Sequence, residues 1–198
     1  SLLMLQHRGQ DAAGISVCDQ KDKLSTRKSM GYVRDVFQQR HMEKLIGNYG
    51  IGHVRYPTAG GNGKEFAQPM YVNSPYGISL AHNGNLTNAK QLSNELFHAE
   101  MRHLQTDSDS EVLLNIFAHE LGKQREIYPN AKNIFKAVSK THLRCDGAYA
   151  VIALITGHGL IAFRDNNGIR PLSIGIRNGK TRDEYILASE DALFSSLG

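Results

Sequence analysis

The chain has 198 residues, of which 40% are hydrophobic and 21% charged, as expected for one soluble globular domain. No apolar run is long enough to cross a bilayer, and the apolar start over residues 1–5 lacks the basic flank of a secretory signal. The net charge of +4 comes from scattered basic residues, and two cysteines cannot form a disulfide framework. We therefore expect a cytoplasmic protein with neither a membrane nor a nucleic-acid partner.

The first quarter of the chain is predicted to be mainly β-structure. Small residues follow the first predicted helix end and let the backbone pass close to a neighbour. A later buried strand would deliver Arg55 and Thr58 to its end. In chain order, the expected elements are a helix end over 2–7 closed by Gly9, strands over 14–18 and 24–27, a partly helical excursion over 35–45, and a strand over 51–54 that Pro57 ends.

An Asn-Gly pair, Asn83-Gly84, follows a short predicted strand over 78–81. At a strand end, such a pair can present a side-chain amide beside a backbone N–H, the donor pair that holds the oxyanion of acyl transfer. Asn-Gly is also a strong turn signal, so a simple turn is the alternative interpretation. The stretch continues into Thr87 and an amphipathic segment rather than a second strand, which argues against an ordinary hairpin.

Three helices are predicted after this pair. Thr87 is a candidate N-cap for the first, and Ser108 followed by Glu111 has the form of a capping box for the second. The third helix is expected over 131–143. The predicted buried positions are Ala89, Leu92, Leu96 and Phe97 in the first helix, then Val112, Leu113, Ile116, Phe117 and Leu121 in the second.

The last part returns to strands. Residues 148–155 are almost wholly apolar, which is typical of a strand covered on both faces. Further strands are expected over 160–163, 172–176 and 185–188. Strand groups flanking helices, without repeats or a linker, predict one α+β domain with helices covering buried sheets.

Common catalytic signatures are absent from the sequence. The nine histidines show no metal-binding spacing, and there is no Gly-x-Ser-x-Gly elbow. Cys18 lies among apolar strand residues, and Cys145 lies between Arg144 and Asp146 before a strand, so we interpret both as packed thiols rather than nucleophiles. We predict no metal in this chain.

A few polar residues at strand and helix ends remain as candidates. An arginine such as Arg55 can bind a carboxylate through two hydrogen bonds, and Asp109 can take an ammonium group. Each has a structural alternative: a surface ion pair for Arg55, and stabilisation of the helix dipole for Asp109. The candidates are Arg8, Arg55, Thr58, Asn83, Gly84 and Asp109.

Five blocks of the chain together resemble the glutaminase domain of the amidophosphoribosyltransferase family. They follow the family's order across nearly the whole sequence. Related class II amidotransferases, such as glucosamine-6-phosphate synthase, have similar blocks with different residues. The blocks are Leu5–Gly14, Gly52–Gly60, His82–Asn88, Ser108–Glu111 and Phe163–Leu172.

The resemblance implies a four-layer αββα fold of the N-terminal-nucleophile (Ntn) hydrolases, in which two stacked sheets lie between helical layers. It implies that the Asn83 amide and the Gly84 N–H form the oxyanion hole. It also implies that Arg55 grips the carboxylate of glutamine, that Asp109 takes its ammonium, and that Thr58 and Arg8 support the pocket. Ammonia would pass to a second domain that attacks phosphoribosyl pyrophosphate (PRPP), at the entry to purine synthesis.

The chain departs from the family at its start. The family's nucleophile is an N-terminal cysteine on a strand, whose α-amino group serves as the base. Ser1 is a nucleophile by type, but Leu2-Leu3-Met4-Leu5 place it on a helix, so we reject it. We expect residues 1–198 to be a partial glutaminase domain without its first strand or a phosphoribosyltransferase domain, and to be inactive alone.

The same resemblance sets the expected cofactors and partners. We expect no cofactor in this chain, Mg²⁺ with PRPP in the parent enzyme, an iron–sulfur cluster in some relatives only, and a homotetrameric parent. The alternatives are the glutaminase domain of another class II amidotransferase and a non-catalytic glutamine-binding module. A nucleic-acid binder is a third alternative.

Overall fold

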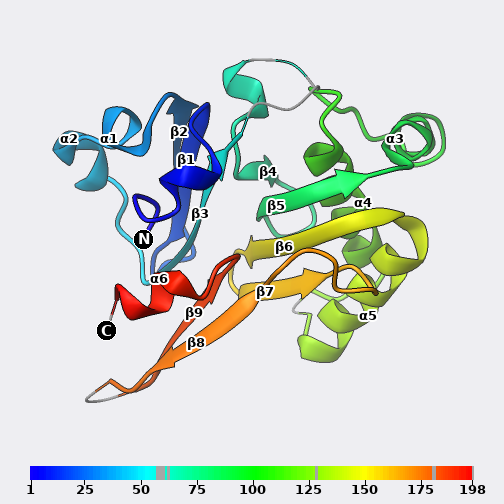
Figure 1. Cartoon of the computed structure of the whole chain (residues 1–198). Coiled ribbons are helices and arrows are strands. Elements are labelled where there is room, and N and C mark those ends of the chain that lie inside the picture. The colour runs from blue at the N-terminus through cyan, green and yellow to red at the C-terminus, as the bar shows by residue number, and fades with distance from the viewer. Residues whose placement is uncertain (57–60, 62, 128, 180–181, 198) are drawn as a thin grey trace.

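The computed structural model describes residues 1–56, 61, 63–127, 129–179 and 182–197. Two sheets lie face to face in it, with helices on both outer sides (Figure 1). The first sheet has the order β2-β1-β3, with β1 over Ala12–Cys18, β2 over Leu24–Met30 and β3 over Tyr49–Arg55. The second has the order β4-β5-β6-β7, with β4 over Met70–Val72, β5 over Ile78–Leu86, β6 over Gly147–Ile155 and β7 over Gly159–Arg164.

The two sheets pack against each other through their inner faces. Cys18 and Ile51 from the first sheet pack with Ala81 and Leu154 from the second. Ser79 Oγ donates a hydrogen bond of 2.8 Å to Ser16 Oγ across the same interface. The predicted pair of stacked sheets is therefore confirmed.

The helices on the second sheet build the main core. These are α3 over Ala89–His98, α4 over Asp109–Gly122 and α5 over Ala131–Arg144. Because successive strand residues point to opposite faces, Leu80 and Val151 face the helices while Ala81 and Leu154 face the other sheet. The second helix, α4, is buried along most of its length, including Leu113, Ile116 and Phe117.

The outer face of the first sheet has a lighter cover. The cover consists of α1 (Val33–Val36), α2 (Gln39–Met42), the start of the chain and the 3₁₀ helix η1 (Gln6–Arg8). Val33, Val36 and Leu2 pack on Ala13 and Val54 there. Together the layers give the expected four-layer αββα architecture.

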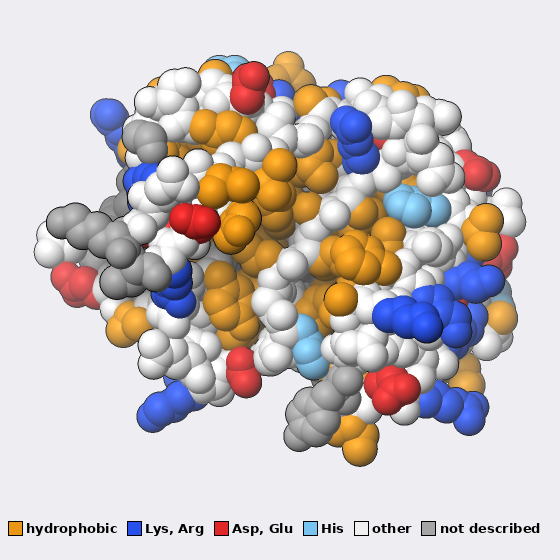
Figure 2. Space-filling view, turned by 90° about the horizontal axis from the view of Figure 1, so that it is seen from below, with side chains coloured by type: hydrophobic (Ala, Val, Ile, Leu, Met, Phe, Trp, Pro, Cys, Tyr) orange, Lys and Arg blue, Asp and Glu red, His pale blue; other side chains and the backbone are white. Residues whose placement is uncertain are grey.

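The end of the described chain forms a hairpin beside the sheets. It consists of β8 (Ser173–Arg177) and β9 (Glu184–Ala188), followed by the short helix α6 (Ala192–Ser195). Ile174, Ile176 and Tyr185 are exposed on the hairpin. Hydrophobic side chains also gather in the middle of the lower face of the molecule (Figure 2). A second 3₁₀ helix, η2, spans Lys64–Phe66. Among the described residues, no helix is long and apolar enough to cross a membrane.

Several local predictions need correction. The strand predicted to end at Ala81 continues to Leu86, because its hydrogen-bonded ladder with β6 runs through the Asn-Gly pair. Thr87 does not cap α3: its hydroxyl donates to Asp146 O at 3.2 Å, and the N-cap is Asn88. Phe97 is 57% exposed rather than buried, because it lies off the Leu92–Leu96 stripe.

Candidate active site

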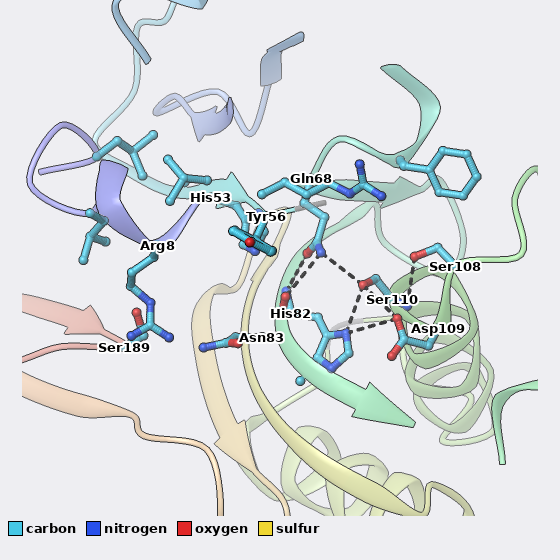
Figure 3. Close-up of a pocket in the computed structure, with 17 residues that line it drawn as sticks. Arg8, His53, Tyr56, Gln68, His82, Asn83, Ser108, Asp109, Ser110 and Ser189 are labelled. Carbon is cyan, nitrogen blue, oxygen red and sulfur yellow. Dashed lines mark hydrogen bonds and ion pairs between the residues drawn. The ribbon is translucent and has the colours of Figure 1, made fainter. Parts of the chain in front are cut away.

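One cavity, of about 180 Å³, opens between the ends of β3 and β5 and the start of α4. The sequence candidates Arg8, Arg55, Asn83, Gly84 and Asp109 all line it. In the view of Figure 3, Asn83 lies between Arg8 on one side and Asp109 on the other. Thr58 lies outside the described residues. The five candidates come from four separate stretches of sequence, so the fold brings distant segments to one place.

Asn83 and Gly84 lie inside β5 and not in a turn. They pair in register with Ala150 and Tyr149 of β6. At Gly84, φ is +150°, and an added Cβ would lie 2.0 Å from Ala148 O, so no side chain fits there. The turn interpretation is therefore wrong, and a sheet ladder fixes both candidate donors.

Asp109 is placed by the first turn of α4. Ser108 is the N-cap and its hydroxyl accepts from Ser110 N at 3.3 Å. Glu111 does not close the expected capping box: its carboxylate accepts from the backbone N–H groups of Gln105 and Thr106, at 2.9 and 2.8 Å. Asp109 Oδ2 accepts from Leu86 N at 3.0 Å, so the carboxylate also ties α4 to the end of β5.

Arg55 is 6% exposed, so the alternative of a surface ion pair is wrong. Its guanidinium hydrogen-bonds to the Asp11 carboxylate and donates to Gly61 O at 2.8 Å. It also lies 5.5 Å from the centre of the Phe66 ring. Arg8 at the cavity edge pairs instead with Glu190, which lies near the end of the chain. Both cations are thus held in place by carboxylates.

Polar residues that the sequence reasoning missed also line the cavity. His82 is 3% exposed, and its Nδ1 lies 2.9 Å from Ser110 Oγ. Gln68 hydrogen-bonds to the same serine at 3.0 Å. His53 lies two residues before Arg55 in β3, so both side chains point to the same face of the strand. This spacing could have identified His53 from the sequence. Gln68 has no comparable local signal.

The environment keeps both histidines neutral near pH 7. Burial, with the neighbouring His82, lowers the pKa of His53 to about 4. Burial also lowers the pKa of His82, although the Asp109 carboxylate acts in the opposite direction. Positive charge at the site therefore comes from the arginines.

The two cysteines lie in the core, as predicted. Cys18 and Cys145 are both buried and unbonded to one another. Burial raises the pKa of the Cys145 thiol to about 12, which makes it a poor nucleophile at neutral pH. No cluster of three or more metal-ligating side chains occurs among the described residues.

The sequence matches the family described as "Glutamine amidotransferase domain" over residues 59–196. The chain therefore belongs to that family, and its layered sheets have the Ntn-hydrolase architecture. Its similar curated relatives carry a more particular name. They include the amidophosphoribosyltransferases of Pseudomonas aeruginosa, 59% identical, and of Escherichia coli K12, 56% identical, each matched over 100% of this chain and 39% of the relative. The chain thus spans about two fifths of the length of these relatives.

Two solved structures are also similar to this chain. A Bacillus subtilis glutamine PRPP amidotransferase, complexed with ADP and GMP, is similar with a TM-score of 0.78 and 36% identity. A structure titled as the allosteric regulatory enzyme of purine biosynthesis has a TM-score of 0.80 and 38% identity. Each comparison covers 98% of this chain and 39% of the solved chain.

Proposed function

We propose that the cavity binds free glutamine and holds its amide for hydrolysis to glutamate and ammonia. The observation that carries this proposal is the convergence of Arg8, Arg55, Asn83, Gly84 and Asp109 on one cavity in a glutamine amidotransferase domain. Arg55 is the carboxylate partner. Its two observed hydrogen bonds use two of its five N–H groups, so donors remain for a ligand. Asp109 is the partner of the ammonium group.

The proposed reaction is acyl transfer through a thioester. A cysteine thiolate attacks the amide carbon, and the Asn83 amide and Gly84 N–H stabilise the resulting oxyanion. The C–N bond breaks, a proton goes to the departing nitrogen, and ammonia leaves. Water then cleaves the thioester to give glutamate and restore the thiol. Cys18 and Cys145 are buried in the core, so neither is the proposed nucleophile; an N-terminal cysteine on a longer chain is.

The longer protein is proposed to be an amidophosphoribosyltransferase, cytoplasmic and homotetrameric. In its second domain, the released ammonia would attack C1 of PRPP, which would be held with Mg²⁺, and would displace pyrophosphate to give phosphoribosylamine for purine synthesis. The names of the similar curated proteins support this choice.

The test is ammonia release from glutamine by these 198 residues, beside a longer chain that begins with the cysteine. We expect turnover by the longer chain and only background release by the shorter one. Turnover by the shorter chain would contradict the assignment of the nucleophile. Calorimetry with glutamine distinguishes this enzyme from a non-catalytic binding module. Such a module would bind glutamine tightly, and neither the shorter nor the longer chain would turn it over.

A further inference from the structure

Gln68 lies at a break in the ladder that supports the Asn-Gly segment. Strand β4 pairs with β5 from Val72↔Ile78 to Met70↔Leu80, and the same antiparallel register continued would place Gln68 opposite His82. Pro69 lies between Gln68 and Met70, opposite Ala81 in that register. The backbone ladder between the two strands ends at the pair Met70↔Leu80, three residues before Asn83.

The side chain of Gln68 supplies the missing hydrogen bonds. Its Oε1 accepts from His82 N at 2.7 Å, and its Nε2 donates to His82 O at 3.2 Å. A carboxamide carries one acceptor and two donors, so it satisfies both backbone groups of His82 as a strand partner would. The second donor goes to Ser110 Oγ at 3.0 Å. Gln68 is 7% exposed, so water does not readily replace these bonds.

The first sheet anchors Gln68 from behind. Lys28 Nζ donates to Ala67 O and Pro69 O, at 2.6 and 3.1 Å, on either side of Gln68. Gly14 of β1 permits this close approach, because a Cβ there would lie 2.0 Å from Gln68 O. Gln68 thus spans from the first sheet to the second sheet and to the first turn of α4.

These contacts enclose the two candidate oxyanion donors. His82 is held by Gln68 through its backbone and by Ser110 through its ring, and Leu86 N is held by Asp109. Asn83 and Gly84 lie between those fixed points. We propose that Gln68 is a positioning residue for amide hydrolysis, whose carboxamide stands in for a strand and holds the oxyanion donors in register with Asp109. This inference rests on the proposed function.

The first test compares Gln68→Met with the unchanged protein in the longer, cysteine-bearing chain. Methionine has a similar length and makes none of the three hydrogen bonds. We expect kcat for glutamine hydrolysis to fall by about 10–100-fold, because small errors in the position of catalytic donors are costly, and KM to change less than threefold. A smaller fall in kcat, or a loss shared with KM beyond threefold, would overturn the proposal. Gln124→Met is the matched control, since Gln124 donates to Glu120 O at the far end of α4.

Gln68→Glu adds a readout that a merely structural role would not give. An ionised glutamate keeps the acceptor for His82 N but has no donor for His82 O, whereas the protonated acid has both. The ratio of variant to unchanged kcat should therefore rise as the pH falls through the carboxyl pKa, which burial raises. The same ratio for Gln68→Met should stay flat. A flat ratio for both variants would contradict the proposal.

Amide hydrogen exchange in the 198-residue chain separates the two possible failures. Exchange of the His82 amide should be at least tenfold faster in Gln68→Met and unchanged in Gln124→Met. If the unchanged longer chain releases no ammonia, the proposed function fails. The exchange rate of the His82 amide then still tests whether Gln68 holds the backbone of His82. If Gln68→Met does not fold, the pH dependence of kcat in Gln68→Glu tests the proposal in its place, and a ratio that stays flat with pH would refute it.

Discussion

The two halves of the cavity wall are built differently. The half on the second sheet, with Asn83, Gly84 and Asp109, stands on a core cluster of 22 buried residues among those described. The half on the first sheet, with Arg8 and Arg55, stands over a cluster of 5 and is held by carboxylates. Asn83 and Gly84, the proposed contacts of the reacting amide, thus stand with Asp109 on the larger core, whereas the two arginines are positioned by ion pairs.

Removal of the Asn83 amide is expected to have the largest effect. In the longer chain, Asn83→Ala should lose about 10²–10³ in kcat, because one oxyanion donor is gone. The measurement is steady-state ammonia release over a range of glutamine concentrations. A rise in KM with kcat unchanged would instead assign Asn83 to substrate binding. The two halves of the cavity wall would then not differ in function as proposed.

Truncation of the two cores tests the difference in support directly. Leu113→Ala in α4 should lower the free energy of unfolding by about 2–5 kcal/mol, because it leaves a cavity in a fully buried site. Val33→Ala in α1, which packs on the first sheet, removes two methyl carbons and should lower the free energy of unfolding by about 1–2 kcal/mol. Urea unfolding of the 198-residue chain measures both. Equal losses would refute the claim that the second half is better supported.

Substitution of Arg55 by lysine sharpens the substrate-binding side of the comparison. Lysine keeps the charge but lacks the planar fork that reaches both Asp11 and Gly61 O. We expect KM for glutamine to rise by about tenfold with a smaller change in kcat. Lys132→Arg on the exposed start of α5 is a control that should leave both constants unchanged. A fall in kcat alone would place Arg55 among the groups acting on the transition state.

The neutral histidine between the halves predicts a dependence of stability on pH. The pKa of His53 is about 4 in the folded protein and near 6.5 when unfolded, so the unfolded state binds more protons between these values. Its contribution is present above about pH 6.5 and is lost as the pH falls towards 4, by at most about 1.4 kcal/mol per pH unit. His53→Gln should flatten that slope in urea unfolding between pH 4 and 7. An unchanged slope would show that His53 contributes nothing to it.

Sequence reasoning recovered the parts of the fold that depend on local pattern. The apolar run at 148–155 and the helical stripe around Leu113 gave β6 and α4 nearly in full. It misplaced the end of β5, because Asn-Gly is a turn signal when no partner strand is considered. The pairing with β6, which decides the matter, is a long-range contact that no short window contains.

The candidate site divides in the same way. Arg8, Arg55, Asn83, Gly84 and Asp109 were identified from their residue types at strand and helix ends, the resemblance implied their roles, and the structure places them on one cavity. Their roles stay predictions. Gln68 was missed because its importance depends on a register that continues past Pro69 and on the serine of a distant helix. Neither feature can be seen from the residues around it.

The alternation along β5 has a consequence for how this domain tolerates change. His82 points into the helical core and Asn83 points towards the opposite sheet. One inserted residue upstream in that strand would exchange these two faces, turning the Asn83 amide towards the helical core and the His82 ring towards the opposite sheet. Insertions and deletions should therefore be confined to the connecting loops, since along this strand folding and chemistry would be lost in a single event.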